Sequence, residues 1–273
     1  MNSALNSVTI PNSTTFLMAS LAILNTVIPL LIAYHYRKRL SVKISTFFIG
    51  LLTYMLFAML LVQLPDLLIR GTIKPFAELV KNSPLTAAIY FSTLTALVEE
   101  VGRFFIYKTM MKNRMTKEEA LMFGAGHGGM QAMFVGSSVM MSNAILAFSL
   151  NSLGAENYVS KLGLTGEKLE TTTKGIIEFG QIPVSSHFFD GTALLILMVA
   201  QIALSYIVFR SIVSKTEIYL FPLAILMHIA LLLPLYLVWK GVITNVFVPE
   251  LIMLLFAMAI IYFAYVMYQK KTD

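Results

Sequence analysis

Two neighbouring glutamates and an arginine stand inside an otherwise apolar stretch, between Leu85 and Lys108. They are Glu99, Glu100 and Arg103. An ionised side chain near the middle of a membrane span costs about 2.5–3.5 kcal/mol on insertion scales. Glu99 is four residues and Glu100 three residues before Arg103, so a helix lets either carboxylate pair with the guanidinium. One arginine neutralises one glutamate, so the other must be protonated or bind something else.

The next apolar run carries a histidine with glycines on both sides. The run reads Phe123-Gly-Ala-Gly-His127-Gly-Gly, and Gln131 follows one helical turn later on the same face. Glycine removes side-chain bulk, so another backbone or a substrate can come close to the imidazole. Gly124 and Gly128 also form a GxxxG pattern, which is typical of tight helix packing. Function and packing are therefore both open for His127.

Two later apolar runs add Gln201 and His228. Helices rise about 1.5 Å per residue, so the depth of a residue in the membrane follows from its distance along the chain to the nearest basic residue at the expected cytoplasmic end of its run. Glu99, His127, Gln201 and His228 then lie about 13–19 Å deep. Packing residues scattered at random would not be expected to share a layer, so we predict that these side chains face one cavity.

The composition indicates the class of fold that positions these side chains. The chain has 273 residues, of which 58% are apolar and 12% charged, and its mean hydropathy is +0.78. An average soluble domain has about 25% charged residues. The sequence therefore predicts a single transmembrane domain over residues 1–273 and excludes a disordered chain. The absence of cysteine excludes disulfides, a thiol nucleophile and cysteine metal ligands.

We predict an all-α, polytopic membrane helix bundle with about seven transmembrane helices. The apolar runs cover residues 16–34, 46–64, 85–107, 119–148, 191–209, 218–239 and 249–268. The cluster Arg37-Lys38-Arg39 follows the first run, and Lys270-Lys271 follows the last. By the positive-inside rule the N-terminus is outside and the C-terminus inside. Twelve of the 20 Lys and Arg residues then lie in cytoplasmic segments and seven outside. We expect a multi-pass protein of the plasma membrane, in contact with lipid and with no nucleic acid partner.

Carboxylates and imidazoles in a dry pocket suit hydrolysis. Together they can bind a metal that activates water. A buried glutamate can also act as a general base on water without a metal. Transporters carry similar buried Glu, Arg and His residues near the midplane, so transport or small-ligand binding stays open at this point.

The motif Glu99-Glu100-x-x-Arg103, the glycine-flanked His127 and the late His228 resemble the YhfC family of intramembrane metalloproteases. That family is similar to the CAAX prenyl proteases, to bacteriocin-processing proteins and to the scaffold subunit of γ-secretase. The resemblance covers about residues 85–273. It implies a peptidase that acts inside the membrane, with zinc as the metal.

Three positions depart from the pattern that the resemblance implies. Gln131 stands where the family has a glutamate, Gln201 where it has a histidine, and Leu232 where it has an aspartate after the last histidine. An amide oxygen is a poor zinc ligand beside an imidazole or a carboxylate. A catalytically inactive relative is therefore an open alternative.

The resulting hypothesis is an intramembrane metalloprotease or glutamate-dependent protease that hydrolyses a membrane-bound peptide near the cytoplasmic side of the bilayer. The alternatives are an inactive scaffold that binds a partner transmembrane helix, and a transporter or small-ligand binder. The candidate catalytic residues are Glu99, Glu100, Arg103, His127 and His228, the candidate zinc ligands are Glu100, His127 and His228, and the supporting residues are Gln131 and Gln201.

Overall fold

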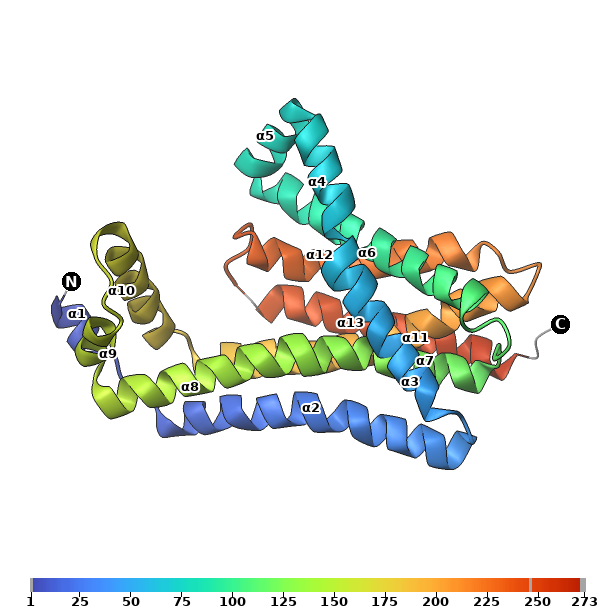
Figure 1. Cartoon of the computed structure of the whole chain (residues 1–273), viewed down its shortest axis with the longest axis horizontal. Coiled ribbons are helices and arrows are strands. Elements are labelled where there is room, and N and C mark those ends of the chain that lie inside the picture. Colours follow the sequence, from blue (N-terminus) through green and yellow to red (C-terminus); the bar gives the residue numbers. More distant parts are fainter. Residues whose placement is uncertain (1, 246, 271–273) are drawn as a thin grey trace. The chain divides into compact units, whose positions relative to one another are not determined.

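The computed structural model describes residues 2–245 and 247–270, and every regular element in this part of the chain is helical (Figure 1). The all-α, polytopic prediction is confirmed. Six helical stretches within the described residues are long and apolar enough to cross a membrane. They are Asn12–Leu40, Ile44–Thr72, Lys117–Leu153, Val184–Val213, Leu220–Trp239 and Phe247–Gln269.

The described residues divide into two compact units. The first holds residues up to Val27 together with Met133–Leu194, and the second holds Ile28–Ala132 and the residues from Leu195 onward. The prediction of a single transmembrane domain is not tested by this division. All seven candidate site residues belong to the second unit.

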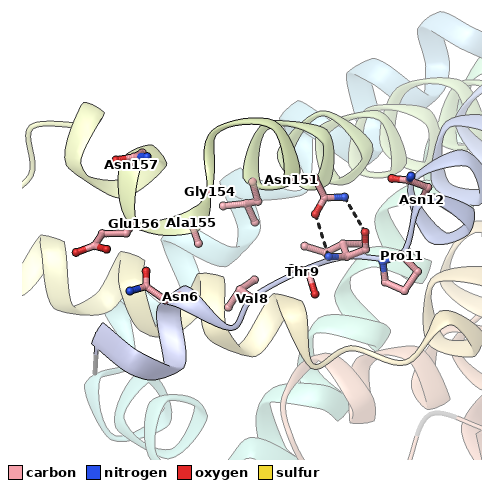
Figure 2. A pocket seen from close by; sticks show the side chains of 12 residues that line it. Asn6, Val8, Thr9, Pro11, Asn12, Asn151, Gly154, Ala155, Glu156 and Asn157 are labelled. Carbon is pink, nitrogen blue, oxygen red and sulfur yellow. Dashed lines mark hydrogen bonds between the residues drawn. The ribbon is translucent and has the colours of Figure 1, made fainter.

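The first unit is a helical cluster around its own apolar core. Its elements are α1 (Asn2–Asn6), the start of α2 (Asn12–Leu40), α8 (Ser137–Leu153), α9 (Ala155–Lys161), α10 (Gly166–Gly180) and the start of α11 (Val184–Val213). Leu21, Leu150 and Phe179 are among the buried core residues. A cavity of about 660 Å³ lies beside the connection between α1 and α2 (Figure 2). There the Asn151 amide fastens the extended chain to α8, because its Oδ1 accepts from the Ile10 N–H (3.0 Å) and its Nδ2 donates to the Ile10 carbonyl (2.7 Å).

The second unit contains the helices that position the candidate site. They are α3 (Ile44–Tyr54), the π-helical turn η1 (Met55–Leu61), α4 (Gln63–Thr72), α5 (Lys74–Asn82), α6 (Pro84–Thr109), α7 (Lys117–Met130), α12 (Leu220–Trp239), α13 (Phe247–Gln269) and the remainders of α2 and α11. Within this unit α7 packs against α3, α6 against α12, and α12 beside α13 (Figure 1). A second π-helical turn, η2 (Gln131–Gly136), continues α7 toward α8.

Local sequence explains where the two site-bearing helices begin. α6 starts with Pro84, and the Ser83 hydroxyl before it accepts a hydrogen bond from the Thr86 N–H (3.2 Å). α7 is capped in the same way, because the Thr116 hydroxyl accepts from the Glu119 N–H (3.2 Å). Serine and threonine at this position satisfy a backbone N–H that the helix itself leaves free. Proline at the first helical position has no N–H to satisfy.

The helix α6 explains the difference between the seven predicted spans and the six stretches found by composition. It has 26 residues, and at about 1.5 Å per residue this length is sufficient to cross a bilayer. Glu99, Glu100 and Arg103 lower its hydropathy, so it is not among the six. Whether α6 makes a seventh crossing, and which way the chain faces, are still predictions.

Contacts at the helix ends show which of these ends lie together. The rings of Tyr107 on α6 and Phe209 on α11 lie 6.4 Å apart, so these two helices end at the same end of the unit. The Lys117 ammonium at the start of α7 lies 4.2 Å from the centre of the Tyr268 ring near the end of α13. The segments expected in the cytoplasm are thus joined in pairs. Lys271, which also entered the topology prediction, lies outside the described residues.

Reporter fusions at Lys112 and Lys215 should therefore both report the cytoplasm, because each lies in a connection that follows one of these helix ends. A fusion at Lys240, at the other end of α12, should report the outside. A reporter at Lys112 or Lys215 that is active only outside the cell would contradict the seven-span topology.

Glycines let α7 lie against helices on two sides. A Cβ on Gly126 would stand 1.9 Å from the Phe47 carbonyl oxygen of α3, and a Cβ on Gly128 would stand 2.7 Å from the Met198 carbonyl oxygen of α11. Both distances are far below any permitted contact, so the backbones approach only because these residues lack side chains. The glycines on either side of His127 therefore serve packing, as their pattern indicated, and this packing holds the imidazole in place.

Gly126→Ala should destabilise the protein by at least about 1–3 kcal/mol, because the new methyl group overlaps backbone that has no rotamer with which to move away. Heat unfolding in detergent measures the effect. Gly175→Ala in α10 is the matched control, since an added Cβ there meets nothing within 4 Å. This control should be neutral or stabilising by about 0.5–1 kcal/mol. Equal stability of the two variants would show that the α3–α7 contact is looser than described.

Candidate functional site

Seven polar side chains from four helices and a π-helical turn meet in one buried network in the second unit. Every member is almost fully buried, with Gln131 the most exposed at 8%. The members are Glu99, Glu100 and Arg103 on α6, His127 on α7, Gln131 on η2, Gln201 on α11 and His228 on α12. The structure therefore brings together all of the residues that the sequence selected, while their chemical roles stay predictions.

The Arg103 guanidinium lies at the centre of the network. Its Nη1 donates to Glu100 Oε1 at 2.6 Å, and its Nη2 donates to Gln201 Oε1 and lies 3.6 Å from Glu99 Oε2. A guanidinium suits this position because its N–H groups form a planar, permanently charged fork. The fork holds both carboxylates on one side of α6 and ties α6 to α11.

Each carboxylate also has an imidazole of its own. His127 Nε2 lies 3.0 Å from Glu99 Oε2, and His228 Nδ1 lies 2.7 Å from Glu100 Oε1. Ionised carboxylates only accept, so both ring nitrogens donate in that state. A neutral His228 then accepts at Nε2, where the Gln201 amide nitrogen lies at 3.1 Å. One assignment of tautomers therefore satisfies all of these contacts.

Gln201 completes the network from α11. Its Nε2 donates to Glu99 Oε2 at 3.3 Å and reaches Gln131 Oε1 at 3.5 Å. One amide thus contacts the arginine, a glutamate, a histidine and the second glutamine. Among the described residues, this long contact is the one side-chain hydrogen bond of Gln131, so Gln131 is held more loosely than the others. Leu232, at the position where the resemblance implies an aspartate, is buried and adds no polar atom.

The charge of the network is not balanced by its own members. Two ionised carboxylates and one guanidinium leave a net charge of −1 when both imidazoles are neutral. Burying an uncompensated charge is costly, so the network in this state favours an additional proton or another cation. Glu100 Oε2 and His127 Nδ1 have no hydrogen-bond partner among the described residues. These atoms are free to take part in a proton transfer.

Aromatic residues that the sequence did not single out fix the position of His127. The Tyr54 ring meets its imidazole edge-on at 5.3 Å, and the Phe123 ring lies nearly parallel to it at 6.2 Å. The Tyr107 hydroxyl donates to the Ser205 carbonyl at 3.1 Å and joins α6 to α11 one helical turn beyond Arg103. Phe123 could have been found from its spacing of four residues before His127, whereas no local pattern marks Tyr54.

The fold and this network define a multi-spanning helical membrane protein with a buried Glu–Arg–His site. The sequence profile of the family described as YhfC intramembrane metalloprotease matches residues 23–253, so the chain belongs to that family. It is 26% identical over 235 residues to the "Uncharacterized membrane protein YhfC" of Bacillus subtilis (strain 168). That match covers 86% of this chain and 89% of the relative. No solved structure gives a significant match.

The family description implies a metal, and the candidate ligands can be tested against that implication. Within the described part of the chain, no group of three or more His, Asp or Glu side chains is arranged to hold a metal ion. The predicted ligands are engaged separately, because Glu100 Oε1 contacts Arg103 and His228, whereas His127 faces Glu99. The predicted ligands Glu100, His127 and His228 therefore do not fit a metal as they are packed.

Proposed function

We propose that this protein is an intramembrane hydrolase that cuts a membrane-bound peptide with a glutamate as the general base. The observation that carries the proposal is the Glu99–His127 pair, 3.0 Å apart and fully enclosed within a charged network. A carboxylate beside an imidazole is a common arrangement for moving a proton. The five ionisable side chains of the network are costly within a membrane bundle and favour function over packing.

The geometry suggests separate roles for the two glutamates. Glu99 is held at a longer distance from Arg103 than Glu100 is, so it is the better candidate to accept a proton from water. His127 donates from Nε2 to this carboxylate and would hold it in place, while Glu99 passes the proton from water on to the leaving amine. Glu100 would stay ionised and orient Arg103 and His228. The Arg103 Nε–H, which has no hydrogen-bond partner among the described residues, would stabilise the oxyanion of the tetrahedral intermediate.

The site must open for this reaction, because in the described state its residues are covered on all sides. Two π-helical turns lie next to it along the chain, η1 directly after Tyr54 and η2 from Gln131 onward. π-Helical turns frequently occur at functional sites and break the regular hydrogen bonding of a helix. We propose that α3 or α7 moves at these turns to admit water and substrate.

The family description implies a metal, and the ligand types favour zinc. We assign no step to it, because the donors do not converge as packed. The plasma membrane as location and a cut near the cytoplasmic side belong to the same proposal. They follow from the predicted topology and from the depth of the four polar positions along their helices.

A non-catalytic scaffold is the second candidate. The observation in its favour is that Gln131 and Gln201 complete a closed hydrogen-bond network, which would hold helices together without any reaction. A transporter is favoured by no specific contact beyond the buried charges themselves.

The test is a cleavage assay in proteoliposomes with a library of single-span peptides, read out by mass spectrometry of the products. The native chain should cut a subset of them. Glu100→Gln and His127→Ala should abolish cleavage while the protein still inserts and purifies. Glu167→Gln, an exposed carboxylate on α10, is the matched control and should retain full activity. Full activity in both site variants would show that the network is structural.

A further inference from the structure

The second unit has a cavity of about 590 Å³ at the end where α5 turns into α6. Arg70 from α4, Lys74 and Lys81 from α5 and Lys240 after α12 line it, together with Glu78 and Phe91. Lys240 lies 12 residues along the chain from His228, or about 18 Å along the helix. The cavity is therefore separate from the Glu–Arg–His network.

The lining of this cavity is strongly cationic. Four basic side chains and one acidic side chain give a net charge of +3. Asp66 pairs with Arg70, which reduces the total to +2. No ion pair holds Lys74, Lys81 or Lys240 in the part of the chain that the structure describes. These three exposed ammonium groups are therefore available to an anion from outside the chain.

One aromatic ring brings two of these cations together. The Lys240 ammonium lies 4.5 Å and the Arg70 guanidinium 5.6 Å from the centre of the Phe91 ring. Such contacts stabilise a cation by about 0.5–1 kcal/mol at exposed sites. Phe91 thus contacts both cations. Arg70 already pairs with Asp66, whereas no carboxylate among the described residues pairs with Lys240, so Lys240 is open to an anionic ligand.

The surroundings of the cavity indicate where that ligand lies. Leu64, Leu67 and Leu68 on α4 and Leu79 on α5 are large apolar residues that are each more than half exposed. Helices with an apolar face and basic residues are typical of the membrane interface. The exposed Trp239 next to Lys240 is also typical of that level. The helices that line the cavity thus also carry exposed apolar residues, an arrangement typical of the level of lipid headgroups.

We infer that this cavity binds the phosphate of an anionic phospholipid headgroup, with Lys74, Lys240 and Arg70 as its contacts. The volume lies within the range of about 300–1,000 Å³ that is usual for small-molecule sites. Acyl chains of the bound lipid would cover the exposed leucines of α4. On the predicted topology the site faces the outer leaflet. This inference does not depend on the proposed hydrolysis.

The test compares the full-length chain in nanodiscs and in neutral detergent. Titration with short-chain phosphatidylglycerol should raise the melting temperature, and phosphatidylcholine should not. The double variant Lys74→Gln/Lys240→Gln should lower the affinity for phosphatidylglycerol at least tenfold. Lys161→Gln/Lys168→Gln removes the same charge from exposed positions elsewhere and should change the affinity less than twofold.

Further arms separate the sources of the phosphate. Inorganic phosphate or glycerol phosphate at the same concentration should give no stabilisation, because neither covers the leucines. Equal stabilisation by free phosphate would overturn the assignment to lipid. An equal loss of affinity in both double variants would show that net charge alone accounts for binding, and this result would also overturn the proposal. Both double variants replace exposed side chains, so neither should disturb folding.

Discussion

Arg103→Met is expected to destabilise the protein by about 3–5 kcal/mol, the usual cost of removing one partner from a buried ion pair. The guanidinium lies 2.6 Å from Glu100 and 3.6 Å from Glu99, and all three side chains are buried. Its removal leaves two carboxylates without a cation in a medium of low dielectric constant. Unfolding in a mixture of mild detergent and dodecyl sulfate measures the change.

Further variants show whether charge is the cause. Adding Glu100→Gln to Arg103→Met should recover much of the loss, because it removes one of the unpaired charges. The stability of Arg103→Lys should lie between that of the native chain and that of Arg103→Met, since an ammonium keeps the charge but cannot contact Glu100 and Gln201 together. Arg114→Met is the control, because this arginine makes an exposed contact to Ser45. An Arg103→Met variant as stable as this control would contradict the described network.

Gln201→His should raise the zinc content from well below one ion per chain to nearly one. The Gln201 amide nitrogen lies 3.1 Å from His228 Nε2 and 3.3 Å from Glu99 Oε2. An imidazole there would be the third of the site, close to a carboxylate, and three such ligands are the common set of a catalytic zinc. The substitution also removes the oxygen that accepts from Arg103, so the guanidinium is free to move away.

The measurement is zinc per chain at equal free metal, on protein purified without chelator. Gln181→His, which adds an imidazole at an exposed position after α10, controls for incidental binding. Full occupancy of the native chain would show that its donors rearrange around a metal. Equal, partial occupancy of native and Gln201→His would place residue 201 outside any metal site.

The sequence was a good guide to the site because charge is rare and costly in lipid. Glu99, Glu100 and Arg103 stand out in an apolar run for that reason alone, and their spacing permitted pairing. Which partner each group takes could not be predicted. The contact of Arg103 with Gln201 depends on how closely the helices approach. Tyr54 carried no signal, since aromatic residues are common along the chain.

The fold was predictable at the level of elements and less so in detail. Apolar runs located the long helices, because lipid requires helices with satisfied backbone groups. The run at 119–148 is α7, η2 and α8 in succession, over Lys117–Leu153. The separation of the residues into two compact units has no counterpart in the composition, which is apolar throughout.

Cleavage of a membrane-bound peptide by the reconstituted chain, before and after metal is removed by a chelator, tests the central claim most directly. If Glu99 and His127 carry the reaction within the network as described, cleavage by the native chain should persist after chelation, and Glu99→Gln should lower its rate at least about 10²–10⁴-fold. Loss of cleavage on chelation, with recovery on adding zinc alone, would contradict this account.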